Sequence, residues 1–164
     1  MGATITATRG VPTVPGEIRW FPMAASQTFK RGQFCYLNES GLLAVCGSDP
    51  GGIAGMAECD ATEASGGEAV TLNVACPITL AKRGQQFTLN VSNGASTLAT
   101  SNVQVGHQAE MYVASNICYC DYGNQSNLRL VVDDIAPDNT VGDTSGRLIC
   151  EVIGDYAQLA QGTS

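Results

Sequence analysis

Short apolar runs separated by turn-forming residues are the feature of this sequence that most restricts its fold. From Phe29 onward, runs such as FCYL, LLAVC and IAGMAEC alternate with segments rich in Gly, Ser, Asn and Asp. Runs of this kind at intervals of about 8–12 residues are typical of a β-sandwich or a small barrel. The 19 glycines and the scarcity of helix-favouring stretches also disfavour α-helix. The sequence therefore predicts an all-β protein.

One phrase occurs twice in the chain. Residues 29–41 read FKRGQFCYLNESG, and residues 81–94 read AKRGQQFTLNVSNG. In each copy a polar Lys-Arg-Gly turn, in which glycine supplies backbone freedom, leads into a Phe that starts a strand. A match of this length at similar offsets favours an internal duplication over chance. We therefore expect two similar β-units, residues 28–78 and 79–153, with an insertion near residues 102–127 of the second.

The two ends of the chain differ in composition from these units. Residues 1–27 contain three prolines, which remove backbone donors and favour extended geometry, so they predict an extended N-terminal arm. Trp20 lies within this arm beside Arg19, and Trp and Arg are side chains that often anchor an interface. A lone tryptophan is nevertheless more commonly a residue of the core or its edge. The polar residues 154–164 predict a surface tail.

The chain is acidic, with 15 Asp and Glu residues, 8 Lys and Arg residues and a net charge of −7. Nucleic acids and anionic membranes select for basic surfaces, so neither is expected as the main partner. The charge is unevenly placed, because residues 1–31 hold four basic side chains against Glu17 alone, which gives this segment +3. Unless this bias is incidental, a basic segment on an acidic body favours docking onto a negatively charged protein surface.

Seven cysteines raise the question of disulfides and zinc. The count is odd, no CxxC motif occurs and His107 is the only histidine, so neither framework is indicated. The first ten residues lack the apolar stretch of a signal peptide, so an oxidising compartment is not expected. Most of the cysteines lie in apolar runs, which predicts small buried hydrophobic side chains. Cys118 and Cys120 share a strand face, which leaves a soft-metal or redox site open.

Catalytic motifs are absent from the sequence. The available pairs of base and nucleophile are His107 with Cys118, Cys120 or a serine, and no nucleophile motif surrounds any serine. No phosphate-binding glycine loop occurs, and the acidic segment 133–143 lacks the spacing of an EF-hand. The sequence therefore predicts a binding or structural protein without metal or cofactor, and not an enzyme.

The order of motifs over residues 28–153 resembles that of the head decoration (cement) proteins of tailed bacteriophages. A Lys-Arg-Gly turn leads into a Phe/Tyr strand, and a Ser-Gly turn, the strand IAGMA, an Ala-rich acidic loop and the stretch GGEAV follow. The second half repeats the pattern in LVVDDIAPDN and GRLICEVI. This resemblance implies a β-barrel or tulip-like sandwich, an N-terminal arm that reaches onto capsid protein and often a trimer. Because this chain is longer than the simplest members of that family and contains two similar units, a monomer or a dimer is an alternative to the trimer.

The resemblance implies that the partner is the major capsid protein and that the chain lies on the outer surface of a virion assembled in the host cytoplasm. It also implies a homo-oligomer, with a trimer favoured. The expected docking residues are Arg9, Arg19, Trp20, Phe21, Lys30 and Arg31. The alternative is a carbohydrate- or receptor-binding module of a fibre or adhesin, with its site at Tyr112, Tyr119 and Tyr122. A third class, a cysteine-dependent enzyme, would need a thiol with a depressed pKa.

Overall fold

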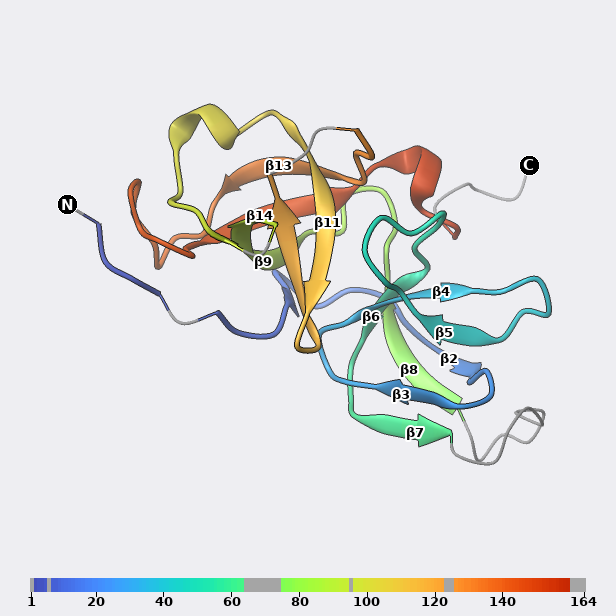
Figure 1. The fold of residues 1–164 in the computed structure, drawn as a ribbon. Coiled ribbons are helices and arrows are strands. Elements are labelled where there is room, and N and C mark those ends of the chain that lie inside the picture. Colours follow the sequence, from blue (N-terminus) through green and yellow to red (C-terminus); the bar gives the residue numbers. More distant parts are fainter. Residues whose placement is uncertain (1, 6, 64–74, 95, 123–125, 160–164) are drawn as a thin grey trace.

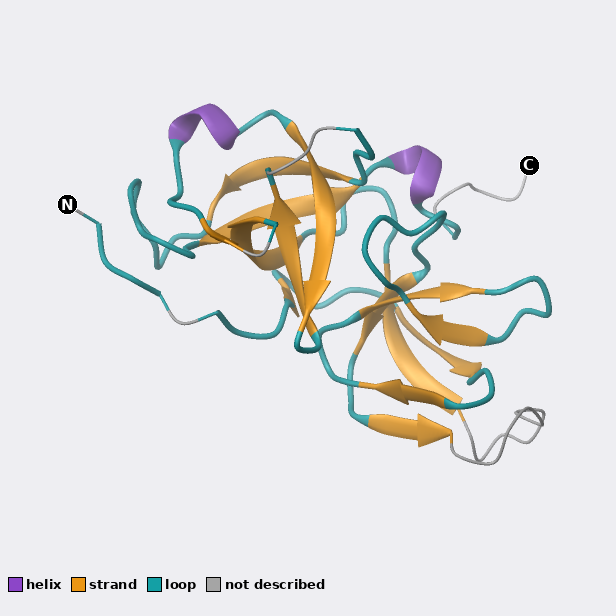
Figure 2. Cartoon of the chain, in the orientation of Figure 1, coloured by secondary structure: helices purple, strands orange, loops and turns teal. Residues whose placement is uncertain are grey.

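The computed structural model describes residues 2–5, 7–63, 75–94, 96–122 and 126–159, and these residues form a nearly all-β protein, which confirms the predicted fold class (Figures 1 and 2). The strands are β1 (Val11–Pro12), β2 (Ile18–Pro22), β3 (Gln27–Phe29), β4 (Phe34–Leu37), β5 (Leu43–Val45), β6 (Gly55–Ala57), β7 (Ala61–Glu63), β8 (Ala75–Leu80), β9 (Phe87–Asn93), β10 (Ser96–Thr97), β11 (Gln108–Ala114), β12 (Ile117–Asp121), β13 (Leu130–Ile135) and β14 (Arg147–Val152). Short 3₁₀ turns lie at η2 (Asn102–Gln104) and η3 (Gly154–Tyr156).

The C-terminal half of the chain curls into a barrel-like sheet. Its strands follow the order β9-β12-β11-β13-β14, and β14 pairs back with β9, so the hydrogen-bonded path returns to its start. The β9–β12 pair is parallel and the other pairs of this ring are antiparallel. Figure 1 shows β9, β11, β13 and β14 gathered on one side of the molecule. Alternate residues such as Leu89, Met111 and Leu148 are fully buried inside this ring.

The N-terminal half forms an open antiparallel sheet in the order β2-β8-β6-β4-β5, next to a ribbon of β3 and β7. Because successive residues of a strand face opposite sides, Phe34 of β4 joins the core of the barrel and Cys35 joins a second core. The rings of Phe34 and Phe87 meet edge to face with centroids 5.1 Å apart, and both side chains are fully buried. One face of the open sheet therefore completes the core of the barrel.

The two copies of the repeated phrase adopt the same turn. Gly32 and Gly84 have φ angles of 89° and 87°, and in each turn the glutamine N–H donates to the lysine carbonyl oxygen at 3.0 Å. These are the features of a type II turn, in which the third residue needs a positive φ. A strand starts at Phe34 after the first turn and at Phe87 after the second. Beyond this point the copies differ, because β4 pairs with β5 and β6 whereas β9 pairs with β12 and β14.

The expected N-terminal arm is extended, but it does not stand apart from the body. Its strand β1 pairs with β9, and its strand β2 pairs with β8 along five residues. Pro12 and Pro22 are accommodated because β1 covers only two residues, at the start of β9, and β2 is an edge strand, where a missing backbone donor is tolerated. The expected boundary between residues 78 and 79 also falls inside β8, which ends at Leu80.

The expected insertion and tail are likewise integrated into the fold. Residues 102–127 supply the hairpin of β11 and β12, and both strands belong to the barrel ring. The part of the tail that the structure describes, residues 154–159, lies against the N-terminal sheet. Ile53 N–H donates to the Tyr156 carbonyl oxygen at 2.7 Å, and Gln158 N–H donates to the Ile53 carbonyl oxygen at 2.9 Å. Residues 160–164 of the expected tail lie outside the described residues.

Candidate functional site

Three of the expected docking residues converge on the carboxylate of Asp60, which lies just before β7. The backbone N–H of Arg31 donates to Asp60 Oδ1 at 2.8 Å. Arg9 Nη1 lies 3.1 Å from the same oxygen, and Lys30 Nζ lies 3.7 Å from Oδ2. The hydrogen bond from Arg31, followed by the charges of Arg9 and Lys30, lowers the pKa of Asp60. The carboxylate is therefore ionised at neutral pH and holds the basic side chains in place.

Close backbone packing between Gly10 and Gly32 sets this arrangement. A Cβ atom on Gly32 would lie 2.3 Å from the Gly10 carbonyl oxygen, and a Cβ atom on Gly10 would lie 2.7 Å from the side chains of Leu89 and Met56. Only glycine fits at position 32, because the atom that a Cβ would meet there belongs to the backbone, whereas at position 10 two flexible side chains would have to shift. The contact fixes Arg9 beside the turn that carries Lys30 and Arg31.

A groove of about 470 Å³ opens beside this cluster, and we call it the arginine groove. Its lining residues are Thr8, Arg9, Gly10, Val11, Arg31 and Arg147. Arg147 begins β14, opposite Asn90 of β9, and its buried Nε atom has no hydrogen-bond acceptor in the described part of the chain. Among the described residues, no carboxylate forms an ion pair with Arg31 or Arg147. The groove with the adjacent Lys30 thus gathers four of the eight Lys and Arg residues of an acidic protein.

Sequence reasoning found part of this site and missed part of it. The sequence grouped Arg9, Lys30 and Arg31 with three residues of β2 as docking residues, and the structure brings the first three together around Asp60. Arg147 and Asp60 were missed, because they approach through pairing between segments that are distant in sequence. The motif GRLIC around Arg147 resembles an ordinary strand start, so no local signal marks it.

The remaining expected docking residues form a second group on β2. Trp20 is 67% exposed and Ile18 is 52% exposed, and they share one face of this edge strand. Arg19 lies over the ring of Phe21, with its guanidinium carbon 5.1 Å from the ring centroid. Trp20 is therefore not a core residue, and β2 presents an aromatic side chain at the edge of the sheet, where no further strand among the described residues pairs with it.

Two of the three expected tyrosines lie together. Tyr112 of β11 and Tyr119 of β12 are cross-strand partners, with ring centroids 6.2 Å apart. Both line a pocket of about 350 Å³ together with residues of the N-terminal segment. Tyr122 lies elsewhere, because its ring packs against the barrel core and its hydroxyl donates to the Gln104 carbonyl oxygen at 3.0 Å. Burial raises the pKa of Tyr122.

The cysteines are free, and six of them are buried, which is the environment expected for small hydrophobic side chains. Burial raises the pKa of Cys35 and Cys46, that of Cys76 to about 12 and that of Cys118 to about 11. These thiols are protonated at neutral pH and therefore poor nucleophiles. Within the described ranges, no group of three or more His, Cys, Asp and Glu side chains is arranged to hold a metal ion. None of the helical turns described here is long and apolar enough to cross a membrane.

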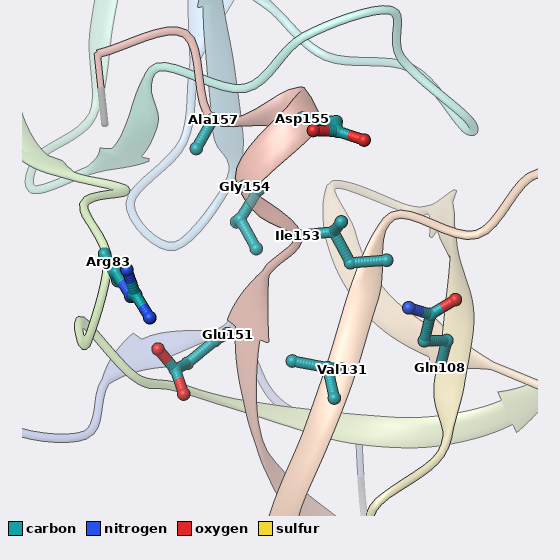
Figure 3. A pocket seen from close by; sticks show the side chains of 9 residues that line it. Arg83, Gln108, Val131, Glu151, Ile153, Gly154, Asp155 and Ala157 are labelled. Atoms are coloured by element: carbon teal, nitrogen blue, oxygen red, sulfur yellow. The ribbon is translucent and has the colours of Figure 1, made fainter. Parts of the chain in front are cut away.

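Another pocket, of about 500 Å³, lies beside β14, and Figure 3 shows Arg83 and Glu151 on its wall. Glu151 Oε1 accepts a hydrogen bond from the Gly84 N–H at 2.8 Å, so this carboxylate closes the second Lys-Arg-Gly turn. Burial, followed by a hydrogen bond with Asp133, raises the pKa of Glu151. Asp133 in turn accepts from Gln86 Nε2 at 2.9 Å. The two acids therefore hold the turn before β9, and this structural role accounts for them.

No protein-family model matches the sequence, and no curated protein matches it significantly. The arginine groove, the β2 edge and the tyrosine pocket are the features of the described chain that bear on its function.

Proposed function

We propose that this chain is a structural virion protein that binds the outer surface of a tailed-phage capsid and stabilises the expanded shell. Its partner in this proposal is the major capsid protein, and the chain acts without metal, cofactor or catalytic step. The observation that carries the proposal is the arginine groove. Arg31 and Arg147 bring two positive charges to one groove without a carboxylate partner among the described residues, in a chain rich in acids.

Neighbouring like charges repel, and this repulsion is relieved when an acidic surface docks against them. Guanidinium groups are suited to this role, because their planar fork binds a carboxylate with two parallel hydrogen bonds. Arg9 and Lys30 are already oriented by Asp60, so less side-chain freedom is lost when they meet a partner. The groove therefore fits an acidic loop of a folded protein.

Trp20 supplies a second anchor in this proposal. Exposed tryptophans often dominate the binding free energy of an interface when a partner buries them. Ile18 and Val14 are also more than half exposed, which extends the apolar surface along the same segment. We also propose, from the resemblance to decoration proteins, that several copies of the chain associate, with a trimer favoured. Native mass spectrometry of the purified chain would measure the number of subunits.

Stabilisation of the shell would follow from mass action. A protein that binds the expanded lattice and not free capsid subunits stabilises each site by RT ln(1 + [L]/Kd), where [L] is the free concentration of the chain. Each site contributes modestly, and many sites on one shell add up. The acidic body of the chain would then face away from the capsid.

Cosedimentation of the full chain with expanded capsids tests the proposal. We expect Arg31→Gln and Arg147→Gln each to weaken binding about tenfold or more, because each leaves a partner carboxylate unpaired. We expect Trp20→Ala to weaken binding by about thirtyfold, as for a hot-spot residue, with little change in folding stability. Arg83→Gln is the matched control, because Arg83 occupies the same place in the second copy of the turn and lies outside the groove. Equal binding by the wild-type, Arg31→Gln and Arg147→Gln proteins would contradict the proposal.

A carbohydrate- or receptor-binding module of a fibre or adhesin is the second candidate, and the tyrosine pocket favours it. Adjacent tyrosine rings at a pocket provide apolar faces with polar edges, which suit the surface of a sugar. Retention of the full chain on a glycan array, lost in a Tyr112→Ala variant, would support this function. Absence of retention would leave Tyr112 and Tyr119 as a stabilising cross-strand pair.

A further inference from the structure

Cys59 and Cys76 face each other across two hydrogen-bonded strands. The register of β6 and β8 pairs Met56 with Thr79 and Ala57 with Ile78. Beyond this pair, the Glu58 N–H donates to the Pro77 carbonyl oxygen at 3.0 Å, so the same register continues past the end of β6. One residue further along each strand, Cys59 therefore lies opposite Cys76.

This position has the geometry that a disulfide needs. Because residues 58 and 77 form the hydrogen-bonded pair, Cys59 and Cys76 occupy the non-hydrogen-bonded position that follows it, where opposite Cα atoms lie about 4.5 Å apart. Disulfides span Cα separations of about 4.4–6.8 Å. The Cys59 thiol is also close enough to contribute to the raised pKa of Cys76. A bond between them would therefore require little backbone movement.

Solvent access distinguishes this pair from the other cysteines. Cys59 is partly exposed, whereas Cys35, Cys46, Cys76, Cys118, Cys120 and Cys150 are buried. Cys120 likewise contributes to the raised pKa of Cys150, but both of these thiols are fully buried inside the barrel. A dissolved oxidant can reach Cys59. Cys76 lies directly opposite and can then react with the oxidised Cys59.

We propose that Cys59 and Cys76 form an oxidation site, at which a small-molecule disulfide such as oxidised glutathione converts the two thiols into an intramolecular disulfide. The sulfur of Cys59, as a thiolate, attacks one sulfur of the oxidant and releases one glutathione thiol. Burial keeps the Cys76 thiol protonated, so its loss of a proton is the slow step, and its sulfur then attacks the sulfur of Cys59 and releases the second glutathione thiol. The two hydrogens lost by the protein thiols are gained by the two glutathione molecules, so electrons and protons balance.

The site goes beyond capsid binding and does not depend on it. The bond would close a ring over residues 59–76, which contains β7 and the start of β8. By the loop-closure argument, such a ring lowers the equilibrium constant for unfolding on the order of a hundredfold. Cys76 also lies opposite Phe21, so the bond would fix β8 at the point where β2 pairs with it.

Mass spectrometry of the intact folded chain after treatment with oxidised glutathione tests the proposal. We expect a mass lower by two hydrogens, with the other five cysteines still open to alkylation after unfolding. Cleavage after glutamate residues separates the two partners, because residues 59–63 then carry Cys59 alone and residues 69–110 carry Cys76 alone. A cross-linked pair of these two peptides is the expected product.

Two variants keep the test decisive. Cys59→Ser removes the accessible thiol, so this protein should keep all its hydrogens under the same treatment. Cys76→Ser should stop at a mixed disulfide and gain one glutathionyl group at Cys59; if this variant does not fold, Cys59→Ser still provides the control. Loss of two hydrogens by the Cys59→Ser protein, a disulfide between other cysteines, or an unchanged or merely glutathionylated wild-type chain would overturn the proposal.

Discussion

At the scale of single residues, the repeated turn offers a controlled comparison between two glycines. Gly32 and Gly84 have almost the same positive φ, but a Cβ atom on Gly32 would overlap Gly10, whereas a Cβ atom on Gly84 would meet nothing within 4 Å. Gly84→Ala should therefore cost about 1–2 kcal/mol of unfolding free energy, from the backbone conformation alone. Gly32→Ala should cost about 1–3 kcal/mol more, because the Gly10 segment must move.

Urea unfolding of the two variants measures this difference. The Gly32→Ala protein should also lose affinity for its partner, since displacement of Gly10 moves Arg9 away from Arg31. Equal destabilisation by the two substitutions would mean that the contact between Gly10 and Gly32 contributes nothing to stability.

At the scale of elements, the first residues of the chain are held by a loop that contains Asp143. The Thr140 N–H donates to Asp143 Oδ2 at 2.8 Å, and the Ala3 N–H donates to Asp143 Oδ1 at 2.9 Å. These hydrogen bonds lower the pKa of Asp143 below its unfolded value of about 3.9. Its contribution to stability is therefore complete above about pH 4 and is lost as the pH falls through the lower folded pKa.

The Asp143→Asn variant tests this contribution. Its melting temperature should lie below that of the wild-type protein at neutral pH, and the gap should narrow as the pH falls below about 4, because the wild-type carboxylate becomes protonated there. Thermal denaturation of both proteins over this pH range measures the gap. A gap that is independent of pH would show that the charge of Asp143 is unimportant.

Deletion of residues 2–22 tests whether strands β1 and β2 are part of the folded body. The deletion removes both strands and exposes the edge of β8, so we expect the melting temperature to fall by roughly 5–15 °C, with a tendency to aggregate. Circular dichroism during heating measures the change. If the truncated chain kept the wild-type melting temperature, residues 2–22 would be a separate arm that does not contribute to the stability of the body.

The elements differ in how far their sequence could predict them. The Lys-Arg-Gly turns were predictable, because a positive φ demands glycine and the polar residues before it favour a turn. The strands beginning at Phe34 and Phe87 were predictable for the same local reason. The pairing of β2 with β8 was not, because Arg19 lies opposite Ile78 across nearly sixty residues of chain. The arginine groove depends on pairings of this long-range kind, and no local pattern contains them.

At the scale of the whole molecule, the barrel and the open sheet share one core. Phe34, Ile53 and Met56 of the N-terminal half are fully buried in the same cluster as Phe87, and the Phe34 N–H donates to the thiol of Cys118 at 3.4 Å. Loss of either half would expose this cluster to water, so we expect the chain to unfold in a single cooperative transition.

Hydrogen exchange measured across a urea series should then give the same midpoint for the amides of β8 and of β14. Phe34→Ala should reduce the free energy of unfolding by about 3–5 kcal/mol. Both midpoints should then fall together. Separate midpoints, or a shift confined to β8, would instead define two independent domains that merely touch at Phe34 and Phe87.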